Sequence, residues 1–330
     1  MKVVDFETPG DPDVLQIGAR ELPNLALLTC HIIIQVAAAG LNVHDTWIRQ
    51  GTLVYRFRSR PCLGYECSGK VVAVGSGVNE FKVGDEVCAF LGNDGGAYAE
   101  FVRVSPSNVL RIPSRVSLVE AAALPKASQL TYFALSVLTN VTLGDTVLIH
   151  ETAAAIDVIA IQYVKHIGCE VFAVAGTEEK LRYCKMLGAD VCINYRKEDF
   201  CKCAKAETGG KGVNIILDVS GRDNFQKNMD CLARGGSLVI SGFKTGSLVE
   251  LDLSSLMKKD ISVIGADIWN LNHRRMSQLW SDVAEKIWPL IENGRIKPII
   301  GKIFTFAEAA DAHRAFEECS IFGKLLLVPE

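Results

Sequence analysis

The first 120 residues alternate between short apolar runs and turn residues. The turn signals include Pro9-Gly10, Gly75-Ser76-Gly77 and the stretch from Gly92 to Gly96. Short apolar runs between such signals are typical of β-strands. The clearest predicted strands are His31–Val36, Lys70–Val74 and Glu86–Phe90. This part of the chain is therefore predicted to be β-rich.

Beyond Ser117 the pattern changes. Leu118–Leu138 is rich in alanine and leucine and predicts a helix. Apolar strand-like runs then alternate with helical segments, which predicts a parallel sheet covered on both faces. The predicted strands are Thr146–His150, Val171–Ala175, Val191–Asn194, Asn214–Val219, Ser237–Ser241 and Ser262–Ala266, and the first two helices are Ala153–His166 and Glu178–Leu187.

After Asp267 the pattern predicts two helices and two strands in alternation. We expect a long helix over Ser277–Asn293, a strand over Lys297–Ile303, a helix over Phe306–Glu317 and a final strand over Gly323–Val328. The chain has 330 residues, of which 49% are hydrophobic, which is enough for more than one core. Two domains are therefore expected.

Charge and cysteine content narrow the functional class. The formal net charge of −3 gives no electrostatic argument for binding nucleic acid or an anionic membrane. The most apolar stretch, Val141–Val164, contains Asp145, Glu151 and Asp157, so it does not predict a membrane span. The N-terminal residues lack a signal-peptide pattern, and the 11 cysteines are expected to be reduced thiols in a cytoplasmic protein. Cys201 and Cys203 are expected to be ordinary thiols rather than metal ligands.

The turn after Thr146–His150 is the expected place for a dinucleotide pyrophosphate. In doubly wound sheets this first strand-to-helix turn carries glycines, so that the backbone approaches the phosphates at a helix N-terminus. Here the turn runs from Glu151 to Asp157 and contains no glycine.

The end of the second strand suggests which dinucleotide would bind. NAD-preferring folds usually place an acidic residue there to bind the ribose hydroxyls. Ala175-Gly176-Thr177 has no acid, and Thr177 and Lys180 are candidates for a 2′-phosphate. Two points stay open: Lys180 is equally compatible with a solvated helix position, and the neighbouring Glu178 and Glu179 would oppose a phosphate.

Several motifs together resemble one enzyme family. They are Pro9-Gly10-Asp11-Pro12-Asp13-Val14-Leu15, Leu41-Asn42 with Asp45, Leu63-Gly64-Tyr65-Glu66-Cys67-Ser68-Gly69, Val83-Gly84-Asp85-Glu86-Val87, Gly96-Ala97-Tyr98-Ala99-Glu100, Leu187-Gly188-Ala189-Asp190, Asn194-Tyr195 with Glu198-Asp199-Phe200, and Phe322-Gly323-Lys324. Over nearly its whole length the chain resembles the quinone oxidoreductases of the zinc-free medium-chain dehydrogenases/reductases, most closely the branch of the p53-inducible quinone oxidoreductase and its plant relatives.

The resemblance implies a fold and a cofactor. Residues 1–122 and 267–330 would form a GroES-like β-rich domain, and residues 123–266 a doubly wound, parallel-sheet Rossmann domain. The implied cofactor is NADPH, and the implied substrate is a quinone or an α,β-unsaturated carbonyl. A homodimer through the edge strand Ile261–Ala266 is also implied.

Site residues follow from the same resemblance. Asn42 matches a position near the nicotinamide and the substrate, and Thr177, Lys180 and Tyr195 match positions that hold the 2′-phosphate. Gly242 and Phe243, in a loop near the cleft, and Lys324 are further expected cofactor contacts. Zinc enzymes of the superfamily carry ligands where this chain has Asn42 and Gly64-Tyr65-Glu66, so no metal is expected.

The chain departs from the family pattern around the cofactor. Three motif glycines correspond to Thr152, Ala155 and Asp157, and a carboxylate at Asp157 would compete with the pyrophosphate for the helix N-terminus. A family threonine near the nicotinamide amide corresponds to Leu130, with Thr131 one residue later. The family's substrate-side tyrosine is absent from Gly51–Leu53, and Tyr55 follows two residues on.

Three functions therefore remain open. The first is an NADPH-dependent reductase in which Asn42, with Tyr55 or His44, hydrogen-bonds the substrate oxygen as negative charge develops. The second is a cofactor-impaired relative that catalyses an isomerisation, cyclisation or rearrangement through His44, Tyr55 and Asp157. The third is a binding protein without catalysis. His44 is also compatible with an ordinary hydrogen-bonded residue lining the cleft.

Overall fold

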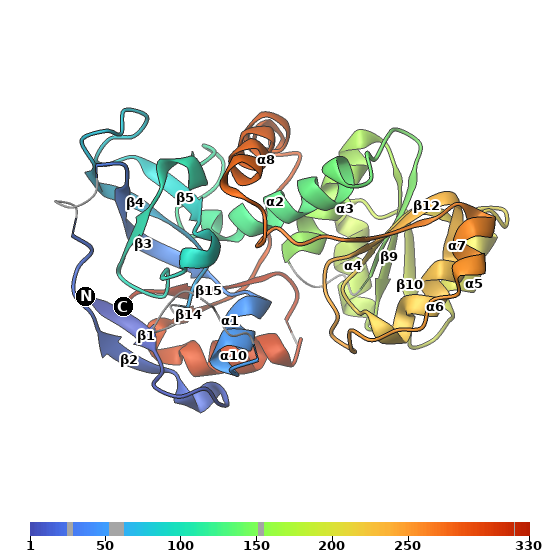
Figure 1. Cartoon of the computed structure of the whole chain (residues 1–330), viewed down its shortest axis with the longest axis horizontal. Helices are drawn as coiled ribbons and strands as arrows, with labels where there is room; N and C mark the ends of the chain where they lie inside the picture. The colour runs from blue at the N-terminus through green and yellow to red at the C-terminus, as the bar shows by residue number, and fades with distance from the viewer. Residues whose placement is uncertain (25–28, 53–62, 151–154, 320) are drawn as a thin grey trace. The chain divides into compact units, whose positions relative to one another are not determined.

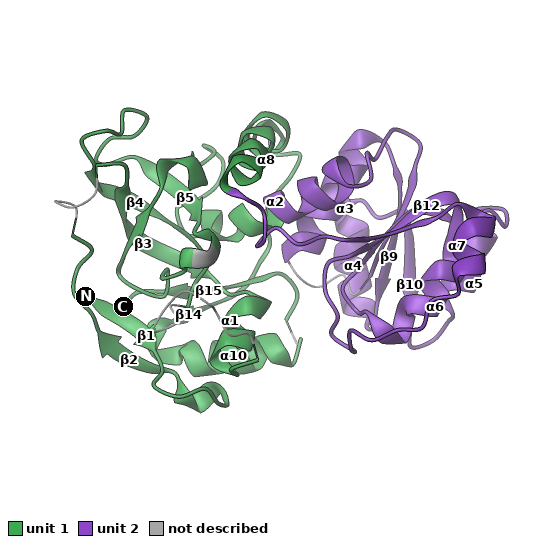
Figure 2. Ribbon diagram, in the orientation of Figure 1, with its two compact units in different colours: residues 1–127, 273–330 green, residues 128–272 purple. Residues whose placement is uncertain are grey.

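The computed structural model describes residues 1–24, 29–52, 63–150, 155–319 and 321–330 (Figure 1). The chain divides into two compact units, drawn in two colours in Figure 2. Unit 1 contains residues 1–127 and 273–330, and unit 2 contains residues 128–272. The divisions lie five or six residues beyond the expected domain ends, because the first falls inside helix α2 (Pro125–Tyr132) and the second at the start of helix α8 (His273–Lys286).

Unit 1 is built on β-sheet. Its larger sheet, as far as the structure describes it, has the strand order β14-β15-β3-β4-β5-β7, with β6 paired to β3. The strands are β3 (Ile32–Gly40), β4 (Glu66–Val74), β5 (Glu86–Phe90), β6 (Phe101–Val104), β7 (Val109–Arg111), β14 (Ile300–Thr305) and β15 (Lys324–Val328). A separate antiparallel pair joins β1 (Lys2–Asp5) to β2 (Gln16–Ala19). The sheet thus unites segments from both ends of the sequence.

Helices and single helical turns complete unit 1. They are α1 (Val43–Arg49), α8, α9 (Trp288–Glu292) and α10 (Ala309–Glu317), with single turns η1 (Pro12–Val14), η2 (Gly92–Asp94), η3 (Pro106–Asn108), η4 (Glu120–Ala123) and η6 (Phe306–Glu308). The single helix expected over Ser277–Asn293 is wrong, because α8 ends at Lys286 and α9 begins at Trp288. Pro289 lies in the first turn of α9, where its missing N–H costs nothing.

Unit 2 is a parallel sheet with helices between its strands, so the expected fold class is confirmed. The strand order is β10-β9-β8-β11-β12-β13, which is the doubly wound order 3-2-1-4-5-6 of a dinucleotide-binding fold. The strands are β8 (Thr146–His150), β9 (Glu170–Ala175), β10 (Val191–Asn194), β11 (Val213–Asp218), β12 (Leu232–Ile240) and β13 (Ser262–Gly265). The helices are α3 (Ala155–Ile167), α4 (Glu178–Leu187), α5 (Phe200–Glu207), α6 (Arg222–Cys231) and α7 (Leu253–Lys259), and a π-helical turn, η5 (Phe133–Val137), extends α2.

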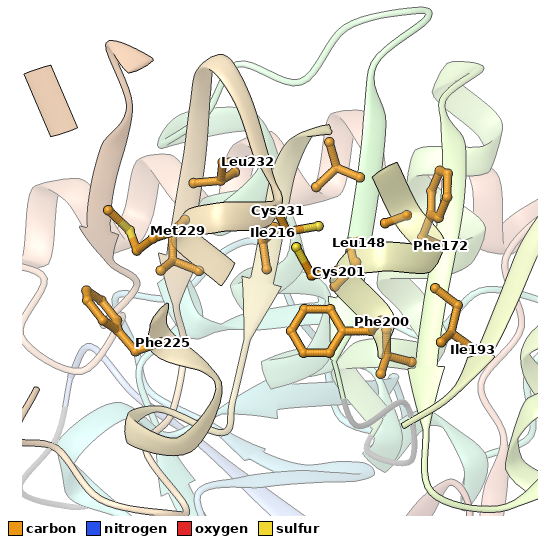
Figure 3. Packing of buried hydrophobic residues seen from close by; sticks show 14 of the residues in the cluster. Leu148, Phe172, Ile193, Phe200, Cys201, Ile216, Phe225, Met229, Cys231 and Leu232 are labelled. Atoms are coloured by element: carbon orange, nitrogen blue, oxygen red, sulfur yellow. The ribbon is translucent and has the colours of Figure 1, made fainter. Parts of the chain in front are cut away.

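One hydrophobic core cluster of unit 2 lies between the sheet and helices α5 and α6 (Figure 3). Leu148, Phe172 and Ile216 come from three neighbouring strands and are fully buried. Phe200 from α5 and Met229 from α6 cover them. Burying each such side chain stabilises the fold by roughly 1.5–3 kcal/mol. This packing holds in place the sheet whose strand ends carry the candidate site. No helix among the described residues is long and apolar enough to cross a membrane.

Candidate active site

Helix α1 is anchored by a buried carboxylate. Asp45, in the first turn of α1, accepts hydrogen bonds from the backbone N–H of Asn42 at 2.8 Å and of Gly64 at 2.7 Å. Gly64 has φ +85°, and a Cβ there would lie 2.5 Å from the backbone nitrogen of Tyr98. Only glycine fits that position. Asp45 thus holds Asn42 and the Gly64 turn together.

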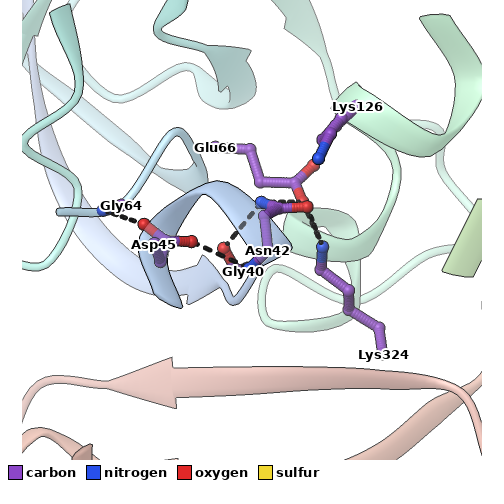
Figure 4. A network of polar contacts seen from close by, with 7 residues as sticks. All are labelled: Gly40, Asn42, Asp45, Gly64, Glu66, Lys126 and Lys324. Carbon is purple, nitrogen blue, oxygen red and sulfur yellow. Dashed lines mark hydrogen bonds and ion pairs between the residues drawn. The ribbon is translucent and has the colours of Figure 1, made fainter. Parts of the chain in front are cut away.

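The side chain of Asn42 lies at the centre of a buried polar network (Figure 4). Its Nδ2 donates to the carbonyl oxygen of Gly40 at 3.1 Å and to Oε1 of Glu66 at 3.0 Å. Its Oδ1 accepts from Nζ of Lys324 at 2.9 Å. Both N–H groups of the amide are therefore used within the protein. In this arrangement the amide has no free N–H for the expected hydrogen bond to a substrate oxygen, and its carbonyl oxygen is the group left to face a ligand.

Lys324 reaches the network from the other end of the chain. Strand β15 pairs with β3, with Leu326 opposite Gly40, and this register brings Lys324 beside the end of β3. Its ammonium forms an ion pair with Oε1 of Glu66, at the start of β4, and both side chains are buried. A Cβ on Gly40 would lie 2.7 Å from Glu66 Oε1 and 2.7 Å from Lys324 Cε. Glycine at position 40 is therefore what leaves room for this pair.

Burial changes the titration of two neighbouring groups. Desolvation raises the pKa of Asp45 to about 6 against the opposing hydrogen bonds from Gly64 and Asn42. Desolvation, with a smaller effect of the Lys126 charge, lowers the pKa of His44 to about 2. The His44 ring lies 5.1 Å from that of Trp47, centroid to centroid. His44 is therefore neutral near pH 7 and has no extra proton to donate.

The carboxyl end of β8 leads to helix α3, the expected pyrophosphate position. Asp157 lies in the first turn of α3, as the sequence predicts. Its side chain is buried. Thr131, on α2, is fully buried and its hydroxyl donates to the carbonyl oxygen of Ile156 at 3.4 Å. Ala155 begins α3. Thr152 and Tyr55, two further predicted site residues, lie outside the described residues.

Polar side chains gather around the carboxyl end of β9. Thr177 caps helix α4 by accepting a hydrogen bond from the backbone N–H of Lys180 at 3.3 Å. Because β10 runs parallel to β9 with Asn194 opposite Ala175, Tyr195 lies beside Gly176. A Cβ on Gly176 would lie 2.7 Å from the Tyr195 hydroxyl and 3.1 Å from Nε of Arg196. We call Gly176, Thr177, Lys180, Tyr195 and Arg196 the strand-end cup.

Glu178, next to the strand-end cup, is paired with two neighbouring side chains. Glu178 accepts hydrogen bonds from Nζ of Lys197 at 2.8 Å and from Nδ2 of Asn194 at 2.8 Å. The Lys197 hydrogen bond, followed by that of Asn194, lowers the pKa of this exposed carboxyl group. The charge of Glu178 is thus offset locally, and its expected opposition to a phosphate is reduced.

Two loops meet at the carboxyl ends of β11 and β12. The Lys244 backbone N–H donates to Val219 O at 3.2 Å, and that of Thr245 to Ser220 O at 2.8 Å. Gly242 is half-buried in this loop, and 47% of the Phe243 surface is exposed. Because the strands are parallel, these loops and the strand-end cup all lie at the carboxyl ends of the strands. Folds of this kind bind their ligands at those ends.

The predicted site residues thus form two described groups. Unit 1 brings together Asn42, His44 and Lys324, and unit 2 brings together Thr177, Lys180 and Tyr195 at its sheet edge. Sequence reasoning missed Glu66 as the partner of Lys324, and Arg196 in the cup; the basic run Arg196-Lys197 after Tyr195 was the available signal for the latter. In the described part of the chain, no group of three or more His, Cys, Asp or Glu residues is arranged to hold a metal ion.

Comparison with known proteins agrees with this architecture. Residues 29–114 match the alcohol dehydrogenase GroES-like domain family, and residues 155–285 match the zinc-binding dehydrogenase family. Quinone oxidoreductase 1 of Escherichia coli K12 is 30% identical over 99% of both chains. A crystal structure of E. coli quinone oxidoreductase complexed with NADPH superposes with a TM-score of 0.91 at 28% identity over 100% of both chains. A crystal structure of an NAD-dependent alcohol dehydrogenase gives a TM-score of 0.90 at 30% identity over 99% of both chains. The chain belongs to the quinone oxidoreductase family of zinc-free medium-chain dehydrogenases/reductases.

Proposed function

We propose that the protein catalyses NADPH-dependent reduction of a quinone or an α,β-unsaturated carbonyl compound without a metal ion. The observation that carries this proposal is the strand-end cup, in which Lys180 and Arg196 flank the end of β9 where an NAD-binding fold usually has an acid. The E. coli relative whose structure contains NADPH supports the same cofactor.

The residues present fit the adenosine end of NADPH. Thr177 and Tyr195 offer hydroxyl groups, and Lys180 and Arg196 offer positive charge, for a 2′-phosphate. Gly176 lets the Tyr195 hydroxyl approach the backbone closely. Asp157 opposes the cofactor, because it places a carboxylate in the first turn of α3.

When bound, NADPH supplies the hydride, and a proton from solvent completes the reduction. The chain's own residues bind and orient. The neutral imidazole of His44 is able to hydrogen-bond a substrate oxygen but not to protonate it near pH 7. Asn42 offers an acceptor.

Direct titration with NADPH and NADH tests the proposal. We expect micromolar binding with a preference for NADPH, followed by NADPH oxidation in the presence of a quinone or an enone. Tight NADPH binding with no turnover across a broad panel of both substrate classes would contradict reduction. Absence of binding at millimolar cofactor would instead favour redox-neutral chemistry, or binding without catalysis, in the same fold.

Replacing Lys180 with methionine tests the strand-end cup. The substitution removes one charged contact to the 2′-phosphate, so we expect the dissociation constant of NADPH to rise about tenfold. NADH lacks that phosphate, and its affinity is expected to be unchanged. Lys185→Met, at the other end of α4, is the matched control. An equal effect of Lys180→Met on both cofactors would show that Lys180 does not read the phosphate.

We further propose a homodimer through β13. This strand is the last in the described sheet of unit 2, and 38% of the Val263 surface is exposed. An open edge with unpaired backbone groups is suited to pairing with a second copy of itself. Val263→Lys is expected to convert a dimer to a monomer in sedimentation at micromolar concentration. Val83→Lys, at an exposed valine of unit 1, is the control. A monomeric wild-type protein would refute the proposal.

A further inference from the structure

The amide of Asn42 has only one orientation that satisfies its surroundings. An ammonium group has donors and no acceptor, so Lys324 must face the amide oxygen. The Gly40 carbonyl and the Glu66 carboxylate only accept, so they must face the amide nitrogen. Turning the amide by 180° would place Lys324 against N–H groups and two acceptors against Oδ1. The network therefore determines which end of Asn42 is available to a ligand.

That orientation depends on the Lys324–Glu66 ion pair. The side chains of Lys324 and Glu66 are 6% and 0% exposed. The second carboxylate oxygen of Glu66 accepts from the backbone N–H of Lys126 at 2.8 Å, so the carboxylate is held at both ends. Without Lys324, Oδ1 of Asn42 would lose its donor and Glu66 would be left as a buried, uncompensated charge.

We propose that Lys324 and Glu66 are positioning residues, which hold the carbonyl oxygen of Asn42 ready to accept a hydrogen bond from an O–H or N–H group of a ligand. The inference rests on the proposed function and specifies the chemistry of one contact in it. Lys324 then acts through Asn42 rather than as the direct cofactor contact that the family resemblance had implied. The ligand group facing Asn42 is a hydroxyl or an amide, not an oxyanion.

A double-mutant cycle separates action through Asn42 from direct cofactor contact. The variants are Asn42→Ala, Lys324→Met and the two combined, with kcat, KM and the NADPH dissociation constant as readouts. We expect each single substitution to lower kcat/KM about tenfold or more, and Lys324→Met to add less than about twofold once Asn42 is alanine. Lys324→Arg keeps a donor cation and is expected to restore most of the activity.

Lys324→Met alone leaves Glu66 as a buried unpaired charge, so a second variant replaces both members of the ion pair with neutral residues. Glu66→Gln combined with Lys324→Met removes both buried charges and is expected to fold while showing the same loss of kcat/KM. If Lys324→Met weakens NADPH binding equally with and without the Asn42 side chain, Lys324 is a cofactor contact and the proposal is overturned.

Hydrogen exchange of the Asn42 side-chain amide provides a test that needs no turnover. In protein labelled with ¹⁵N-asparagine, the Asn42 signals are assigned by their loss in Asn42→Ala. We expect slow exchange in the wild type and in Lys324→Arg, and exchange at least about tenfold faster in the neutral double variant, because the amide loses Lys324 and the Glu66 carboxylate and keeps only the Gly40 carbonyl as a fixed partner. The Asn194 side-chain amide, bound to Glu178, is the internal control. Unchanged exchange at Asn42 would overturn the inference. Faster exchange in a protein that never oxidises NADPH would support the positioning role while removing the proposed reduction.

Discussion

Replacing Asp157 with asparagine is expected to tighten NADPH binding by about two orders of magnitude. Asp157 is buried in the first turn of α3, where a dinucleotide-binding fold holds the pyrophosphate. At an effective dielectric constant near 20, two unit charges about 5 Å apart repel by roughly 3 kcal/mol. Asparagine keeps the shape of the side chain and removes the charge, and 3 kcal/mol corresponds to about a hundredfold in affinity.

Calorimetric titration of both proteins with NADPH measures this effect. Glu170→Gln is the matched control, because it changes the net charge equally but lies at the amino end of β9, at the opposite edge of the sheet. NADH carries the same pyrophosphate, so its binding should tighten by a similar factor. If neither cofactor binds more tightly to Asp157→Asn, the carboxylate does not face the pyrophosphate. The missing glycines would then have to account for any weakness in binding.

The fold of unit 2 was predictable because its strands are continuous apolar runs. Such runs mark strands buried on both faces, and β8, β10 and α4 have the predicted bounds. Prediction was poorer where the local signal is mixed. Strand β12 begins at Leu232 rather than the expected Ser237, because Gly235 and Gly236 interrupt the apolar run although the strand continues through them. Helices α5, α6 and α7 and the short strands β1, β2, β6 and β7 were not located individually, because their local signals are also mixed.

The candidate site divides along similar lines. Thr177 and Lys180 lie on one strand-to-helix turn, so their proximity follows from local sequence. The partnership of Lys324 with Glu66 joins residues 258 positions apart, and it depends on the register of β15 against β3. No periodicity encodes that register. A buried lysine next to Asn42 therefore became visible only in three dimensions, and it fixes the amide with its carbonyl oxygen towards the lysine.

Three buried groups of unit 1 are expected to lower the stability of the protein by about 3 kcal/mol as the pH decreases from 6 to 4. Desolvation, followed by the Arg49 charge, lowers the pKa of His313 to about 3, and His44 titrates at about 2. Both imidazoles stay neutral in the folded protein but are protonated in the unfolded chain below 6.5, so each destabilises the fold as the pH falls. Asp45 has the opposite sign. Its folded pKa of about 6 exceeds the unfolded value of 3.8, so in this window the folded state takes up a proton that the unfolded state does not.

The net difference is about one proton, or about 1.4 kcal/mol per pH unit. Two variants should change the pH dependence of the free energy of unfolding in opposite directions. His313→Gln removes one imidazole, so the slope of the unfolding free energy between pH 6 and 4 should decrease by about 1.4 kcal/mol per pH unit. Asp45→Asn removes the compensating carboxyl group, so the slope should increase by about the same amount even though an acid has been deleted. Urea unfolding at several pH values measures all three slopes, and a shallower slope for Asp45→Asn would show that the Asp45 carboxyl group is ionised in the folded protein throughout this range.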